Sequence, residues 1–413
     1  MGFWQLLLGI IVGIFVLMIL VVIHELGHFL AARKAGIKVE EFGIGFPPRL
    51  WSWEWKKKGS GQWFKRNDVD DTGALKKSDS FIFSFNCLPI GGFCRVQGDE
   101  SDSVTASKKK GKGDYASATF GEKSLFIFGG IIANFIATAV IFTVLVLFGM
   151  PRVFDNQFVI PSDTRETYGE VVVSGVVEGS PAEEIGLAFG DELLVIAGTD
   201  ITRAYQVSQL TREYRGEQVD IFYRTEDGEY KSAVVQLNSE GESGFLGIGT
   251  FQDSSIRATW SAPIVGVGLT AQFTYETVKG LGDLMGGFFS GVFRQFSRDS
   301  EVREQGQADI KATGDGFAGP IGIVGVLLPN AVQSGIVWVL FLAAIISISL
   351  AVMNALPIPA LDGGRWLLTA IFKAIRRPLT PGIESKINAI GFMFLIGLMI
   401  LMTVLDIGRL GGN

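Results

Sequence analysis

Four long apolar runs divide the chain. They cover residues 3–23 (continuing to 32), 124–149, 335–356 and 388–405. Each approaches or exceeds the roughly 20 apolar residues that a helix needs to cross a bilayer. The first run has no basic segment and no small-residue cleavage site, so we interpret it as a retained helix and not as a signal peptide. The pattern predicts a polytopic α-helical membrane protein with about four transmembrane helices: 1–32, 124–149, 335–359 and 388–407.

The segment between the first two runs, residues 33–123, contains a strand pattern. In "FIFSFNCLPIGGFCRV" (81–96), Phe residues alternate with smaller ones before a Pro-Ile-Gly-Gly turn that ends in Gly91 and Gly92, and a second short run follows. This pattern is typical of a β-hairpin. Its apolar content predicts that the hairpin re-enters the bilayer or a cavity among the helices. Residues 51–79 and 99–117 on either side are rich in Lys, Asp, Ser and Gly, which favours mobile linkers.

Residues 166–250 change to short Val- and Ile-rich strands with turns. The stretch "VVVSGVVEGSPAEEIGLAFGDELLVIAGTDI" (171–201) consists of a strand, a Gly-Ser-Pro-Ala turn, a short helix, Gly-Asp and a second strand. It resembles the core of a PDZ domain, and a helix near 204–214 with strands near 218–223 and 230–237 would complete it. We therefore expect one inserted PDZ-like α+β domain.

Two further apolar segments are interrupted by Gly, Pro or polar residues. In residues 262–296 the apolar positions recur at roughly helical spacing, which favours an interfacial amphipathic helix over a fifth span. The segment "GFAGPIGIVGVLLP" (316–329) is broken by Gly and Pro. At membrane depth, such backbone is tolerated only inside protein or beside a water-filled cavity.

Charge decides the orientation of these segments. Residues 33–123 contain 17 Lys and Arg against 12 Asp and Glu, residues 151–333 contain 13 against 26, and residues 360–387 contain 5 against 2. The positive-inside rule places 33–123 and 360–387 in the cytosol, and the PDZ-like domain and both termini on the outer side of the membrane. The hydrophobic content of 48% is too high for a simple soluble enzyme, and the net charge of −6 averages two unlike sides, so it does not indicate a nucleic-acid partner.

The only two histidines of the chain stand four residues apart, as His24 and His28 in "HELGH". On a helix, positions i and i+4 share a face, so both imidazoles can bind one metal ion with Glu25 beside it. Ionisable groups within a membrane helix are unfavourable and usually mark function. We therefore predict a catalytic zinc site in which Glu25 is the general base for hydrolysis of a peptide bond.

Catalytic zinc commonly has three protein ligands and a water, so a third ligand is needed. It must be a carboxylate or one of the two cysteines, whose spacing fits no recognised zinc motif. Asp362 follows the third helix at its cytosolic end, at the depth of the histidines, in "MNALPIPALDGGRW" (353–366). Pro357 and Pro359 break the helix just before it, and Gly363 and Gly364 let the backbone approach closely. Topology therefore selects Asp362.

These features together resemble the site-2 protease family of intramembrane zinc metalloproteases (peptidase family M50), in its bacterial regulator-protease branch. The resemblance rests on HELGH in the first helix, on Asn354 through Leu361-Asp362-Gly363 in the third, and on the PDZ-like domain between the second and third helices. It covers nearly the whole chain. It departs from better-known members in one respect, since these often carry two tandem PDZ domains.

The resemblance implies roles for individual residues. His24, His28 and Asp362 match the zinc ligands, Glu25 matches the base, and Asn354 is implied to contact substrate or steady the site. The resemblance also implies that Gly130 and Asn134 of "GGIIANF" (129–135) form a Gly-x-x-x-Asn element, for which helix packing is the alternative. It implies that the 81–96 segment is a membrane-reentrant β-loop that receives substrate as a strand. Gly-Pro-Ile-Gly at 319–322 is similar to a family motif as well.

The family's substrates are single-span membrane proteins already trimmed by a site-1 protease, such as anti-sigma factors, and in some members remnant signal peptides. The PDZ-like domain is implied either to exclude untrimmed substrates or to bind a new carboxyl terminus. A catalytically dead scaffold is an alternative, but Glu25 and Asp362 are intact. A metal transporter is another, but the chain has no internal repeat.

Overall fold

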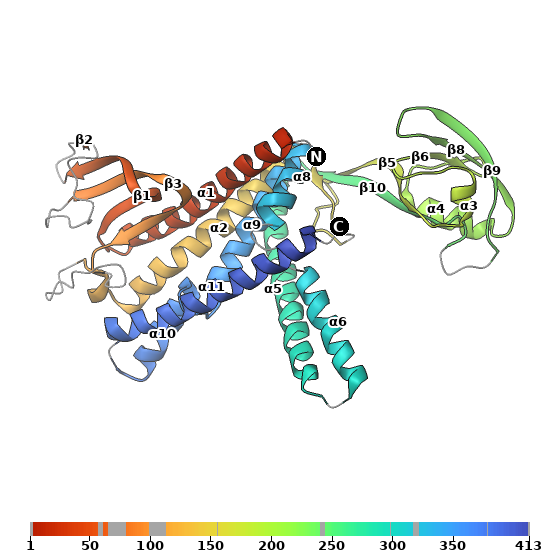
Figure 1. Cartoon of the computed structure of the whole chain (residues 1–413). Coiled ribbons are helices and arrows are strands. Elements are labelled where there is room, and N and C mark those ends of the chain that lie inside the picture. Colours follow the sequence, from red (N-terminus) through yellow and green to blue (C-terminus); the bar gives the residue numbers. More distant parts are fainter. Residues whose placement is uncertain are drawn as a thin grey trace. The chain divides into compact units, whose positions relative to one another are not determined.

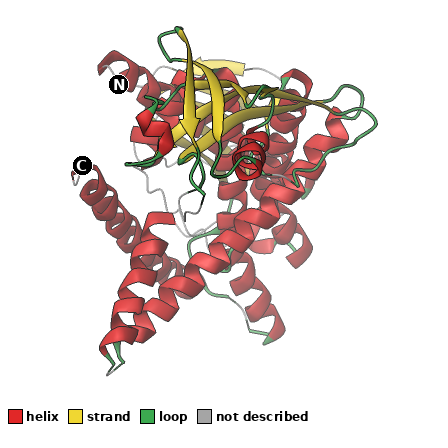
Figure 2. Cartoon of the chain, turned by 90° about the vertical axis from the view of Figure 1, so that its right-hand side faces the viewer, coloured by secondary structure: helices red, strands yellow, loops and turns green. Residues whose placement is uncertain are grey.

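The computed structural model describes residues 3–56, 61–64, 80–98, 113–154, 156–239, 244–297, 299–316, 322–377 and 379–411. The chain forms two compact units. We call residues 1–144 with 263–413 the membrane domain, and residues 145–262 the β domain. Helices make up most of the described chain, and the strands belong to two sheets (Figure 2).

Long helices dominate the membrane domain (Figure 1). Three of them are long and apolar enough to cross a membrane, among the residues described: α1, α2 and α9. The fourth predicted run lies within α11, and its role as a span stays a prediction. The helices are α1 (Phe3–Lys34), α2 (Phe120–Phe148), α5 (Ala262–Gln295), α6 (Ser300–Gly316), α8 (Leu328–Ser334), α9 (Ile336–Ala355), α10 (Asp362–Ala374) and α11 (Pro381–Gly411), with the short 3₁₀ helix η2 (Tyr115–Ser117) and the π-helix η3 (Ile323–Leu327).

The interrupted apolar segments both form helices. Residues 262–296 form the continuous helix α5, beside which α6 lies (Figure 1); whether α5 lies in the interface stays a prediction. In the other segment, residues 317–321 lie outside the described residues, and η3 and α8 follow. There α8 packs closely on α1, because a Cβ at Gly9 would lie 2.4 Å from the Cα of Pro329.

The connection between α1 and α2 forms a sheet of β1 (Val39–Lys56), β2 (Gly61–Phe64) and β3 (Ser80–Val96), in the order β2-β1-β3. Residues 41–44 of β1 lie between two stretches of β3, so that Phe42 pairs with both Cys94 and Phe83. The prediction of a hairpin at 81–96 is therefore wrong in its pairing: β1 separates the two arms. Gly91, with φ of 107°, lies between them.

The prediction of a linker over 51–79 is also wrong where the structure describes it. Residues 51–56 belong to β1, and β2 pairs with them, Ser52 opposite Phe64. Trp51, Trp53 and Trp55 alternate with smaller or charged residues, which is the period of a strand. The lysines that follow Trp55 concealed this pattern.

Two local features place α2 against α1. The helix begins with a capping box, in which the Thr119 N–H donates to Glu122 Oε2 (2.7 Å) and the Glu122 N–H donates to Thr119 Oγ1 (3.3 Å). Further along, a Cβ at Gly27 of α1 would lie 2.2 Å from the carbonyl oxygen of Gly129. Small residues let two membrane helices approach this closely. The contact lies one residue from His28, so α2 passes directly over the histidines.

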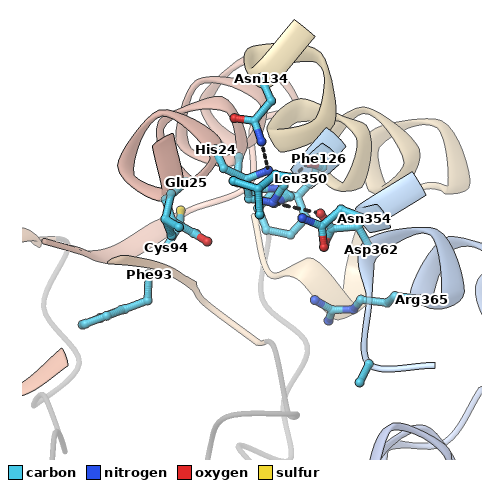
Figure 3. A pocket seen from close by; sticks show the side chains of 13 residues that line it. His24, Glu25, Phe93, Cys94, Phe126, Asn134, Leu350, Asn354, Asp362 and Arg365 are labelled. Atoms are coloured by element: carbon cyan, nitrogen blue, oxygen red, sulfur yellow. Dashed lines mark hydrogen bonds and ion pairs between the residues drawn. The ribbon is translucent and has the colours of Figure 1, made fainter. Parts of the chain in front are cut away.

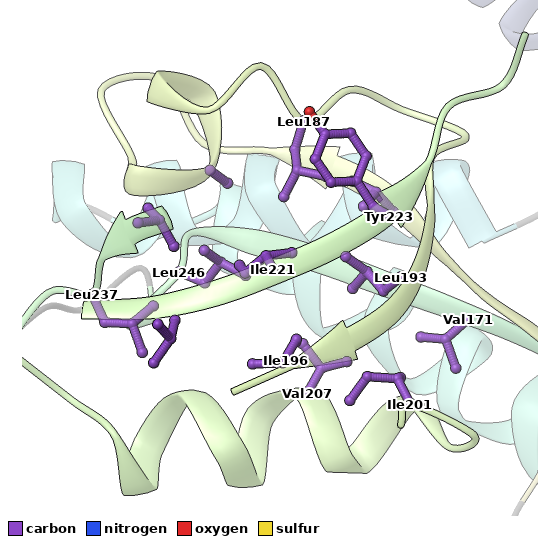
Figure 4. Packing of buried hydrophobic residues seen from close by; sticks show 14 residues of the cluster. Val171, Leu187, Leu193, Ile196, Ile201, Val207, Ile221, Tyr223, Leu237 and Leu246 are labelled. Carbon is purple, nitrogen blue, oxygen red and sulfur yellow. The ribbon is translucent and has the colours of Figure 1, made fainter. Parts of the chain in front are cut away.

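The β domain contains a sheet with the strand order β4-β10-β5-β6-β8-β9, and β7 pairs with β6. The strands and helices predicted for a PDZ-like domain lie within it. Buried Leu193, Ile196 and Ile221 of the sheet pack with Val207 of α4 (Figure 4). The elements are β4 (Met150–Pro151), β5 (Arg165–Val176), α3 (Pro181–Glu184), β6 (Glu192–Ile196), β7 (Thr199–Asp200), α4 (Ala204–Glu213), β8 (Gln218–Arg224), β9 (Tyr230–Gln236) and β10 (Ile248–Arg257).

Candidate metal centre and active-site pocket

The two histidines of α1 and the first residue of α10 converge at one point. The Nε2 atoms of His24 and His28 lie 3.1 Å apart, and Asp362 Oδ2 lies 3.1 Å from the first and 3.3 Å from the second. Both histidines are buried. The structure thus brings together the three residues that the sequence proposed as ligands, although Asp362 is 338 positions from His24.

The break between α9 and α10 places Asp362. After Ala355 the chain leaves the helix through Pro357, and α10 begins at Asp362. Gly363 is packed so tightly that a Cβ would lie 2.3 Å from the carbonyl oxygen of Ala355. A side chain at 363 would therefore push Asp362 away from the histidines.

The spacing of these atoms fits a zinc ion. Ligand atoms about 2.0–2.2 Å from a tetrahedral zinc lie about 3.3–3.6 Å from one another, close to the three separations observed here. The His28 Nδ1–H donates to the backbone carbonyl of Phe126 (2.9 Å), so the Nε2 of neutral His28 carries a lone pair. That lone pair faces His24 Nε2 and a carboxylate oxygen, and a cation would compensate the resulting repulsion.

Asp362 has the charge state that a metal ligand needs. Burial raises the pKa of this carboxyl, but hydrogen bonds with His24 and His28 lower it further, so its pKa lies well below the ordinary value. The carboxyl is therefore ionised at neutral pH, and the donor set of two imidazoles and one carboxylate is common in catalytic zinc sites.

Asn134 of α2 contacts the other nitrogen of His24. Its Nδ2 lies 3.3 Å from His24 Nδ1, and its Oδ1 is buried without a hydrogen-bond partner. Rotation of the amide by 180° exchanges its oxygen and its NH2 group with almost no change in shape. When Nε2 of His24 binds a metal, Nδ1 carries the proton and requires an acceptor. We therefore expect the amide oxygen of Asn134 to face His24 in the metal-bound protein.

We predict that Asn134→Ala weakens zinc binding, because His24 loses the acceptor that fixes its orientation. Loss of such a partner typically lowers metal affinity by about 10- to 100-fold. Titration of the purified protein against buffered zinc would measure this, with Asn354→Ala as the control because Asn354 lines the pocket from α9 outside the ligand cluster. Unchanged zinc affinity of Asn134→Ala would contradict the role.

Glu25 lies beside this cluster and not within it. The cluster of ligand atoms within 4.8 Å of one another consists of His24, His28 and Asp362. Glu25 lines the same pocket, a cavity of about 370 Å³ (Figure 3). Pockets of this size accommodate small ligands or a short stretch of peptide. The lining residues are Val21, His24, Glu25, His28, Phe93, Cys94, Phe126, Asn134, Leu350, Asn354, Ala360, Asp362 and Arg365.

The other residues singled out in the sequence fall in three places. Asn354 lines the pocket from α9. Gly130 of α2 lies directly against the histidines, since a Cβ there would be 2.5 Å from His28 Nε2. Gly91 and Gly92 lie on β3 against α1, where a Cβ at Gly92 would be 3.6 Å from the Cγ of Glu25. Pro357 terminates α9 and is not among the lining residues.

Sequence reasoning missed several residues of this region. Arg365 lines the pocket and forms an ion pair with Glu384 of α11, its Nε 3.1 Å from Oε1. Only its position three residues after Asp362, on the same face of α10, could have indicated it. Cys94 also lines the pocket. Glu41 of β1 is fully buried and forms ion pairs with Arg49 and Arg95.

Nearly the whole chain is similar to proteins of one peptidase family. The sequence pattern of peptidase family M50 matches residues 12–62 and 74–398. The zinc metalloprotease RasP of Shouchella clausii is 27% identical, with 95% of this chain and 97% of that protein covered. RasP of Geobacillus kaustophilus is 26% identical, with 94% and 95% covered.

Among solved structures, the PDZ domain of an SdrC-like protein from Listeria monocytogenes matches 20% of this chain and 90% of that domain. The identity is 24% and the TM-score 0.19. With a score this low, the PDZ-like character of the β domain rests on its own sequence and strand order.

Proposed function

This chain is a membrane zinc metalloprotease of peptidase family M50, and we propose that it cleaves the membrane-spanning segments of single-span proteins. His24, His28 and Asp362 would hold Zn²⁺, and Glu25 would be the general base. The observation that carries the proposal is the convergence of Asp362 on the two histidines of an apolar helix, at a pocket that Glu25 also lines.

Each group in the pocket would carry out a different part of peptide hydrolysis. Zn²⁺, when bound, lowers the pKa of a water and polarises the scissile carbonyl. Glu25 takes a proton from the attacking water and passes it to the leaving amine as the C–N bond breaks. Asn354, which lines the pocket from α9, would donate to a substrate carbonyl.

The location of the site supports this substrate class. The histidines are on α1, whose sequence is long and apolar enough to span a bilayer, so the scissile bond must reach membrane depth. A helical substrate keeps its backbone groups paired and must unwind before attack, and pairing with a strand such as β3 would hold it extended. Substrates already trimmed by a site-1 protease, such as anti-sigma factors or remnant signal peptides, fit this requirement.

The charge distribution supports an orientation. The Lys- and Arg-rich loops 33–123 and 360–387 would lie in the cytosol, and the acidic β domain outside the cytoplasmic membrane. The pocket would then open toward the cytosolic side. The β domain would meet substrates outside the membrane, either as a filter against untrimmed proteins or by binding a new carboxyl terminus.

The test is cleavage of a single-span test protein in liposomes that contain the purified chain. We expect mass spectrometry to locate the cut within the apolar segment of the substrate. The chelator 1,10-phenanthroline should stop cleavage and added Zn²⁺ should restore it, whereas the non-chelating 1,7-isomer should have no effect. Cleavage confined to soluble loops, or insensitive to chelation, would contradict the proposal.

A further inference from the structure

Strand β3 runs alongside the segment of α1 that carries the base. A Cβ at Gly91 would lie 3.3 Å from the Cγ1 of Val21, and a Cβ at Gly92 would lie 3.6 Å from the Cγ of Glu25. A side chain at position 91 would therefore be tight against the helix, and position 92 lies at ordinary van der Waals distance from Glu25. The residues that follow, Phe93 and Cys94, line the catalytic pocket (Figure 3).

The backbone N–H of Cys94 lies within reach of the carboxylate of Glu25 and faces it as a hydrogen-bond donor. Cys94 lies opposite Phe42 of β1. Along a strand, the N–H groups of successive residues point alternately to its two edges, so an N–H that reaches Glu25 is not the one that pairs with β1. The outer edge of β3 thus directs a main-chain donor at the base. In Figure 3 the two residues lie side by side, apart from the histidines and Asp362.

We propose that the backbone amide of Cys94 positions Glu25 for proton transfer. This inference rests on the proposed function, since it assigns Glu25 the role of base. Glutamate has three rotatable side-chain bonds, and a hydrogen bond to one carboxylate oxygen restricts them while the other oxygen stays available for the proton of the attacking water. The sheet would therefore hold the base from the side opposite to the zinc ligands.

The proposed role belongs to the backbone amide of Cys94 and not to its thiol. Two substitutions at this position therefore separate the two groups. Cys94→Ala keeps the N–H, whereas Cys94→Pro removes it. Proline is tolerated on an edge strand where its nitrogen faces away from the ladder, so the sheet need not be disrupted. Cys94→Pro should lower kcat by about 10- to 100-fold, the effect of misplacing a catalytic group by about 1 Å. Its KM and zinc content should stay within about twofold of those of Cys94→Ala.

Equal kcat values for Cys94→Pro and Cys94→Ala, with zinc bound in both, would overturn the positioning role while leaving the proposed protease function intact. Loss of zinc from Cys94→Pro would also overturn it, because the amide would then act on the metal site as a whole.

A second measurement does not depend on activity. Hydrogen–deuterium exchange at the amide of residue 94 should be slow in the parent protein and in Glu25→Gln, whose side-chain carbonyl still accepts the hydrogen bond. In Glu25→Ala the acceptor is gone, and exchange at this amide should be at least about tenfold faster. The same exchange rate in Glu25→Ala and Glu25→Gln would overturn the contact, even for a protein that cleaved no test substrate.

Discussion

Replacement of Glu25 by glutamine is expected to abolish cleavage while zinc stays bound. The amide has nearly the shape of the carboxylate, so the packing of α1 beside β3 is preserved. It cannot accept the proton of water, however, and general-base catalysis typically contributes about 10²- to 10⁴-fold to the rate. Glu25 is outside the ligand cluster of His24, His28 and Asp362, so metal content should be unchanged.

Cleavage of the single-span test protein in liposomes would be measured together with zinc by atomic emission. Asp362→Asn is the informative comparison, because it removes a ligand charge and should lower zinc content as well as activity. A Glu25→Gln protein that cleaves at the parent rate would show that another group is the base. One that loses its zinc would place Glu25 among the ligands.

The convergence of the three candidate ligands could be predicted from the sequence because its parts are local or topologically constrained. The spacing of His24 and His28 fixes both on one face of a helix whatever the rest of the chain does. Asp362 could be chosen because few acidic residues lie at the cytosolic ends of the apolar runs. The match to peptidase family M50 confirms the predicted family and zinc metalloprotease class.

The sheet was harder to predict because its pairing is not local. The alternation in 81–96 predicted strands correctly, but two arms joined by a Gly-containing turn normally pair with each other. Here residues 41–44 lie between them, a pairing between segments about 40 residues apart that leaves no signal in either segment alone. The contact of the Cys94 amide with Glu25 could not be predicted either, because it depends on that register and on a main-chain group that every residue has.

A methyl group at Gly130 is expected to be as damaging as the loss of a ligand. A Cβ at this position would lie 2.5 Å from His28 Nε2, 2.6 Å from His24 Cε1 and 2.7 Å from His24 Nε2. These separations are far below van der Waals contact, and both rings are buried. Gly130→Ala should therefore displace both imidazoles, with loss of zinc and a fall in cleavage of roughly 10²-fold or more.

Gly121→Ala on the same helix is the control for this prediction, because a Cβ there meets nothing within 4 Å. Within a helix, alanine is more favourable than glycine by about 0.5–1 kcal/mol, so neither substitution should weaken α2 itself. Gly121→Ala should keep full zinc content and activity. Full zinc content and activity in Gly130→Ala would contradict the prediction. In that case α2 would lie farther from the histidines than the 2.2 Å separation between a Cβ at Gly27 and the Gly129 carbonyl oxygen implies, and the metal centre would not be enclosed between α1 and α2.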